Sequence, residues 1–176
     1  MKKNITKKIT FVGLMTAVIA VLSQIAIPLP SGVPITLQTF AVALTGYMLS
    51  YKYGSAAVVT YILLGAGGGP GFSGLKGGAG VLFGVTGGFI FGFLPMAFLC
   101  GLSSKMKQIP ALLMGLAGLF VCHALGTVQF YFISGEPFIA AFLKVSAPYL
   151  IKDIISVIAA YYVFRLMSKR KVFRID

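Results

Sequence analysis

Apolar residues dominate the chain in long runs that are interrupted by glycine, proline or charged residues. A helix needs about 20 mostly apolar residues to cross a bilayer. On this pattern we predict six spans in a single membrane domain covering residues 1–176, near residues 9–27, 35–51, 54–66, 80–103, 110–132 and 143–167. The third run is short for a full span, so we expect its neighbours to bury part of it or the helix to continue into the glycine-rich segment that follows.

Composition supports a membrane protein. The chain is 58% hydrophobic and only 10% charged, whereas soluble domains carry roughly 25% charged residues. We therefore predict an all-α integral membrane protein of the cell membrane, surrounded by the lipid bilayer.

The net charge of +12 is concentrated at the ends of the apolar runs rather than along one face, which disfavours nucleic-acid binding. If both termini are cytoplasmic, twelve of the 15 basic residues lie inside, as the positive-inside rule requires. These twelve are Lys2, Lys3, Lys7, Lys8, Lys52, Lys105, Lys107, Arg165, Lys169, Arg170, Lys171 and Arg174. The outer side then holds Lys76, Lys144 and Lys152 together with the acids Glu136 and Asp153.

Two outer segments, IPLPSGVPITLQT (27–39) and GAGGGPGFSGLKGGAG (65–80), are rich in glycine and proline. Glycine lets the backbone approach a ligand closely, but such segments also serve as flexible connectors.

Small residues recur at helical spacing in three of the predicted spans. Gly80, Gly84, Gly88 and Gly92 would form one stripe, and Gly118, Cys122 and Gly126 another. Both stripes are interpreted as helix-packing faces. Gly13 and Ala17 make a smaller stripe on the first span, which could pack inside the bundle or dock another protein.

We do not expect this chain to be an enzyme. It has no Gly-Lys-Ser/Thr nucleotide-binding sequence and no paired-carboxylate motif. His123, the only histidine, has no acidic neighbour in sequence and is interpreted as a hydrogen-bonded helix residue. Cys100 and Cys122 lack metal-site spacing and are interpreted as free packing thiols. We predict no catalytic residues, no cofactor and no metal.

The last span contains adjacent charges, Lys152 and Asp153. A charge at the centre of a membrane helix costs about 2.5–3.5 kcal/mol, so such residues usually mark a functional site. Neighbouring residues point about 100° apart around a helix and are not expected to pair with each other. Tyr149 shares a face with Asp153, and Gln38 and Lys76 could approach from the loops. In the alternative reading Lys152 snorkels to the headgroups and Asp153 caps or pairs within the bundle.

Two segments, IPLPSGVPITLQTFAVALTG (27–46) and GPGFSGLKGGAGVLFGVTGGFIFGF (69–93), resemble the BioY family, and the resemblance extends over nearly the whole chain. Members are the biotin-binding S-components of energy-coupling factor (ECF) transporters. The resemblance implies six helices that capture biotin at the outer face, a transmembrane coupling subunit and two cytoplasmic ATPases as partners, and a docking face on the first helix that maps to Gly13, Ala17 and Ala20. Val85 stands where similar proteins usually have proline. Ser156 stands where they often carry a lysine three residues after the aspartate.

Biotin's chemistry suggests roles for these residues. Its ureido N–H groups would donate to Asp153, and its valerate carboxylate would pair with Lys76 or Lys152. Phe72, Phe83 and Tyr149 would supply apolar walls. Three alternatives stay open: an S-component for another vitamin, a secondary transporter acting alone, and a structural membrane scaffold.

Overall fold

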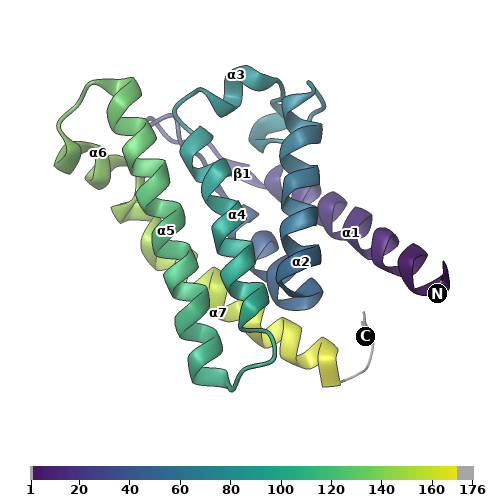
Figure 1. Ribbon diagram of the computed structural model, residues 1–176. Coiled ribbons are helices and arrows are strands. Elements are labelled where there is room, and N and C mark those ends of the chain that lie inside the picture. The colour runs from purple at the N-terminus through teal and green to yellow at the C-terminus, as the bar shows by residue number, and fades with distance from the viewer. Residues whose placement is uncertain (1, 170–176) are drawn as a thin grey trace.

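The structure, a computed structural model, describes residues 2–169 and the side chains of residues 5–169. It is almost entirely helical, which confirms the predicted all-α class (Figure 1). The elements in chain order are α1 (Lys2–Ser23), β1 (Ala26–Ile27), β2 (Ile35–Thr36), α2 (Gln38–Ala66), the 3-10 turn η1 (Ser73–Leu75), α3 (Ala79–Leu82), α4 (Gly87–Leu102), α5 (Gln108–Ser134), α6 (Phe138–Val145) and α7 (Ala147–Lys169). Of the basic residues counted above, Arg170, Lys171 and Arg174 lie outside the described residues, as do the side chains of Lys2 and Lys3.

The continuous assignment of α2 contains a sharp reversal at Ser50. Its φ and ψ of 63° and 170° are not helical. A Cβ built on Gly54 would lie 3.0 Å from the Cα of Gly46, eight residues earlier. In a straight helix these positions would be about 12 Å apart along the axis. The chain therefore folds back, and the two halves of α2, 38–49 and 51–66, correspond to the predicted runs 35–51 and 54–66.

The prediction of one helix over residues 80–103 is wrong for the first part of that range. The chain makes the single turn α3, leaves helical structure, and starts again as α4 at Gly87. A Cβ on Gly87 would clash with the carbonyl oxygen of Leu82, so only glycine fits this turn. The side chain of Gln129 on α5 donates to the carbonyl oxygens of Leu82 and Gly84, both at 2.8 Å. A side chain from another helix thus satisfies backbone groups that a continuous helix would have paired.

The glycine faces of α4 and α5 pack against each other. A Cβ on Gly92 would lie 2.6 Å from the Cα of Cys122, and one on Gly118 would lie 3.0 Å from the Cα of Met96. Gly88 likewise meets the backbone of Gly126. The predicted stripe on α5 is confirmed, whereas the four-glycine stripe is reduced to Gly88 and Gly92 because Gly80 and Gly84 precede α4.

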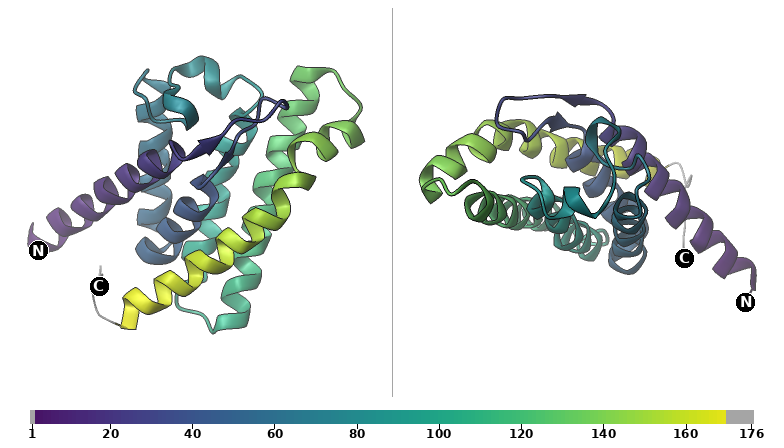
Figure 2. Two further views of the ribbon diagram at one scale, coloured as in Figure 1. Left: turned by 180° about the vertical axis from the view of Figure 1, so that it is seen from behind. Right: turned by 90° about the horizontal axis from the view of Figure 1, so that it is seen from above.

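Figures 1 and 2 show how the helices are arranged. Helices α2, α4 and α5 stand side by side, α7 crosses behind them, and α1 leans outward from the bundle. The β1–β2 hairpin, η1, α3 and the α5–α6 connection gather at one end, which we call the loop end. The Ser50 reversal and the α4–α5 connection lie at the opposite end.

Many large apolar side chains remain exposed on the outside of this bundle. Examples are Leu63 on α2, Phe120 and Phe132 on α5, and Ile155 on α7. Apolar surface on this scale is expected where helices face lipid rather than water. Among the described helices, Ile5–Ser23 of α1 and Gln108–Ser134 of α5 are long and apolar enough to cross a membrane by length and composition alone.

Candidate functional site

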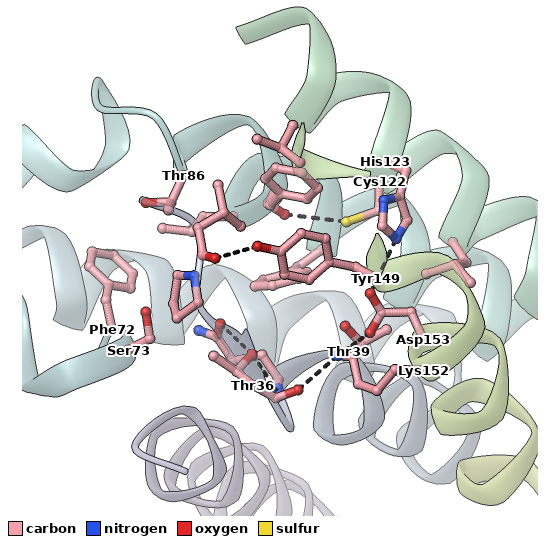
Figure 3. A pocket seen from close by; sticks show the side chains of 18 of the residues that line it. Thr36, Thr39, Phe72, Ser73, Thr86, Cys122, His123, Tyr149, Lys152 and Asp153 are labelled. Carbon is pink, nitrogen blue, oxygen red and sulfur yellow. Dashed lines mark hydrogen bonds and ion pairs between the residues drawn. The ribbon is translucent and has the colours of Figure 1, made fainter. Parts of the chain in front are cut away.

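A cavity of about 610 Å³, counted out to its open mouth, lies beneath the loop end (Figure 3). Side chains from α2, α4, α5 and α7 form its inner walls, and the β1–β2 hairpin, the η1 segment and α3 cover it. Its lining is typical of small-molecule sites, which are mostly apolar with a few converging polar groups. The apolar lining consists of Val33, Pro34, Phe72, Val81, Phe89, Ile90, Phe93, Leu119 and Val145.

One side of the cavity carries its charged groups. Asp153 on α7 is 5% exposed. Its Oδ2 lies 3.2 Å from Nε2 of His123 on α5, and its Oδ1 forms an ion pair with the Lys152 ammonium. The ammonium also donates to the carbonyl oxygen of Thr36 at 2.8 Å. We call the group Lys152, Asp153 and His123 the charged side. It places a buried hydrogen-bond acceptor, the Asp153 carboxylate, directly beside a donor, the Lys152 ammonium.

The opposite side of the cavity is made by the glycine-rich segment that precedes α3. In Figure 3, Phe72, Ser73 and Thr86 lie across the cavity from the charged side. The Phe72 ring is buried between Tyr61, at a centroid distance of 5.6 Å, and Gly65, where a Cβ would clash with it. Packing therefore requires glycine at position 65, because any larger residue would push Phe72 out of the cavity wall.

Two polar side chains tie the covering hairpin to the helices. The Tyr149 hydroxyl donates to the carbonyl oxygen of Val33 and lies 3.0 Å from the Ser31 hydroxyl. Gln38 accepts from Thr36 at 3.0 Å and donates to the Tyr61 hydroxyl at 2.7 Å. These bonds fix the 28–36 segment over the cavity.

Five of the seven predicted binding residues line this cavity, and they are Gln38, Phe72, Tyr149, Lys152 and Asp153. The other two do not belong to its described lining. Phe83 is 76% exposed in the turn after α3, and Lys76 is exposed on the covering segment four residues after Phe72. The structure thus removes Phe83 from the walls. It links Lys76 to the lining only through the backbone, where the Phe72 N–H donates to the Lys76 carbonyl oxygen.

The expectation that Lys152 and Asp153 do not pair is wrong. Their Cα–Cβ directions do diverge, but the four-carbon stem of Lys152 is long enough to bring the ammonium round to the carboxylate. The same geometry contradicts the snorkelling of Lys152, because Thr36 and Asp153 hold its ammonium at the cavity. The other part of that alternative is confirmed, since Asp153 pairs within the bundle with His123 and Lys152.

The sequence reading missed His123, Thr39 and Cys122 as cavity residues. His123 is hydrogen-bonded, as predicted, and one of its partners is Asp153, which lies 30 residues later in the sequence, on α7. Its uniqueness in the chain was the only available signal. Cys100 and Cys122 are both buried and free, as expected, and the Cys122 thiol also faces the cavity.

Known proteins are similar to this chain in sequence and in fold. The BioY family profile matches residues 1–172. The biotin transporter BioY of Thermotoga maritima is 42% identical, over 92% of this chain and 96% of its own length. The corresponding protein of Rhodobacter capsulatus is 33% identical, over 93% and 94%. A crystal structure of the S-component for biotin from an ECF-type ABC transporter superposes with a TM-score of 0.88 at 26% identity, covering 96% of this chain and 94% of that one. The chain belongs to the BioY family.

Proposed function

We propose that this chain is the biotin-binding S-component of an ECF-type transporter, an integral protein of the cell membrane that captures biotin without altering it. The observation that carries the proposal is the charged side of the cavity. The chain has only three acidic residues, and it buries Asp153 in a largely apolar cavity at the loop end. Ionisable residues inside membrane helices usually mark a functional site. Here Lys152 and His123 hold the carboxylate in the lining of the cavity, where a ligand can reach it.

The adjacency of Lys152 and Asp153 suggests how biotin would be oriented. The ureido ring carries N–H donors beside a carbonyl acceptor, so one edge can donate to the Asp153 carboxylate while its oxygen accepts from the Lys152 ammonium. Phe72, Phe89 and Tyr149 would enclose the thiophane ring and the alkyl tail.

The valerate carboxylate would then lie away from the charged side, because the tail carries it several bonds from the ring. It would point toward the covering segment, which carries the exposed Lys76. Of the two lysines considered from the sequence, we therefore assign Lys76 to the valerate and Lys152 to the ureido carbonyl.

We infer further that six helical segments cross the membrane: α1, the two halves of α2, α4, α5 and α7. Lys52 follows the Ser50 reversal, and Lys105 and Lys107 lie in the α4–α5 connection, so these three belong to the end opposite the loops. This supports a cytoplasmic assignment for that end and, with Lys7 and Lys8 near the start of α1, for both termini. The cavity would then open to the outside.

A coupling subunit would dock on α1, and two ATPases would bind to it. Gly13 and Ala17 are exposed, and a Cβ on Gly13 would meet no described atom within 4 Å. Ala20 on the same side is partly buried. The opposite side of α1 packs through Met15 and Ile19. Gly13 and Ala17 thus form a short notch of small residues between the exposed Ile9 and Val21, in which a partner helix could pack closely.

The test is a calorimetric titration of the purified protein with biotin, riboflavin, thiamine and folate. We expect saturable binding of biotin alone; heat from another vitamin and none from biotin would reject the assignment. Asp153→Asn removes the charged acceptor and should weaken biotin binding by roughly ten- to a hundredfold. Glu136→Gln is the matched control, because Glu136 pairs with the exposed Lys144 and neither residue belongs to the described cavity lining. Unchanged affinity in Asp153→Asn would remove Asp153 from the site.

A further inference from the structure

His123 connects the charged side of the cavity to the junction of α6 and α7. Its Nε2 lies 3.2 Å from Asp153 Oδ2, and its Nδ1 lies 3.0 Å from the Ser146 hydroxyl. Ser146 follows α6 and lies 2.7 Å from the Thr127 hydroxyl, one turn along α5 from His123. The chain Thr127–Ser146–His123–Asp153 is buried throughout.

The Asp153 carboxylate determines which atom donates in each of these hydrogen bonds. An ionised carboxylate only accepts, so Nε2 must carry a proton and donate to Asp153. Nδ1 can then accept from the Ser146 hydroxyl, which also lies 3.5 Å from the His123 carbonyl oxygen. The Ser146 oxygen can then accept from Thr127. In this arrangement Thr127, Ser146 and His123 each donate toward the carboxylate.

Packing alone does not hold the imidazole in this position. On one side the ring meets the edge of Phe89 at a centroid distance of 5.6 Å. On the side away from the cavity, His123 and Thr127 border a second hollow, lined by Phe120, Phe138 and Phe142. A side chain with open space on one side would change rotamer readily without hydrogen bonds at both ring nitrogens.

We propose that His123 is a positioning residue for biotin binding, which holds the Asp153 carboxylate in the orientation that receives the ureido N–H groups. His123 reaches one carboxylate oxygen and Lys152 reaches the other, so neither oxygen can turn away from the cavity. This inference rests on the proposed function, because it assigns His123 a role only through Asp153. It places the determinant of biotin affinity on α5 as well as on α7.

Two substitutions of similar length separate donation from packing. In His123→Gln the amide nitrogen can occupy the place of Nε2 and donate to Asp153, whereas His123→Met fills similar space without a donor. Calorimetry should show a biotin Kd within a few-fold of the parent for His123→Gln and at least about tenfold weaker for His123→Met. Equal affinities for the two variants, at equal apparent Tm, would overturn the proposal.

Two further measurements test the hydrogen bonds that link Thr127, Ser146, His123 and Asp153. Because His123 is the only histidine, ¹⁵N NMR of histidine-labelled protein reports on it alone. A proton on Nε2 is expected, and a bare Nε2 would overturn the proposal. Ser146→Ala should weaken biotin binding several-fold, while Ser103→Ala, an equally buried serine on the far side of the bundle, should not. If Asp153→Asn binds biotin as tightly as the parent, the proposed function of Asp153 fails; if only Asp153→Asn weakens binding, the role of His123 alone fails.

Discussion

At the residue scale, the two sides of the cavity differ in how tightly their charged groups are held. Asp153 has partners on α5 and α7, and Lys152 is anchored to the backbone of Thr36 as well. Removing Lys152 would leave the buried Asp153 carboxylate with His123 as its remaining partner, which should destabilise the fold. Lys76 on the covering segment is exposed, so its replacement should affect the ligand and not the fold.

Lys76→Ala tests the assignment of the valerate. We expect a several-fold loss of biotin affinity, because an exposed ion pair is worth about 0.2–1 kcal/mol. Biotin amide, whose tail is neutral, should bind the parent and the variant equally. Titrations with both ligands measure this, and Lys144→Ala, a lysine already paired with Glu136, is the control. The same loss for biotin and its amide would contradict the assignment.

Tyr149→Phe tests whether the hairpin is held over the cavity by this hydroxyl. The variant keeps the ring but loses the bonds to Val33 and Ser31, so the 28–34 segment should open more readily. Biotin dissociation should accelerate several-fold while the apparent Tm changes little. Stopped-flow displacement of bound biotin measures the rate. Tyr51→Phe, at the opposite end of the bundle, is the control, and an unchanged rate in Tyr149→Phe would show that the hydroxyl does not hold the hairpin.

Only part of the cavity could be recognised from the sequence. Asp153 was identifiable because an acid inside an apolar helix is costly, and Tyr149 because it lies one turn away on the same face. The ion pair of Lys152 depends on a side-chain rotamer, and the bond of His123 depends on how α5 lies against α7, so neither follows from spacing along one helix. Phe83 was misplaced because the turn after α3 was read as helix.

At the element scale, tertiary contacts override helical periodicity at two places. The turn at 83–86 is stable because Gln129 on α5 satisfies its carbonyl oxygens, and the Ser50 reversal fits closely against Gly101 on α4. Glycines at four-residue spacing predicted close packing correctly where the helix is continuous. They could not show where it begins, because glycine suits both a packed helix and a tight turn.

Gly92→Ala tests the α4–α5 contact. The added methyl group would lie 2.6 Å from the Cα of Cys122, so the two helices must separate, at a cost of about 1–3 kcal/mol. A lower apparent Tm and a smaller monodisperse fraction on size-exclusion chromatography are expected. Gly80→Ala gains the same helix propensity on α3 but meets no described atom within 4 Å, so it should keep the parent Tm. Equal Tm values for the two variants would show that α4 and α5 tolerate a wider spacing.

At the scale of the whole molecule, the bundle separates its two proposed tasks. The cavity lies beneath the loop end, enclosed by α2, α4, α5, α7 and the covering segments, whereas α1 leans away and packs mainly against α2 (Figure 2). The small residues Gly13 and Ala17 do not belong to the described cavity lining. Ligand capture and partner docking should therefore be separable by substitution.

Replacing both Gly13 and Ala17 with leucine tests this separation. The two side chains would project from the exposed side of α1 and keep a partner helix from approaching closely, because helix pairs in membranes pack through small residues. Biotin affinity should match the parent, since the cavity is untouched, while copurification with a coexpressed coupling subunit should fall to background. Val59→Leu, an exposed position on α2, controls for added apolar bulk facing lipid. Normal copurification of the double variant would place the docking surface elsewhere, and a loss of biotin affinity would show that α1 also supports the cavity.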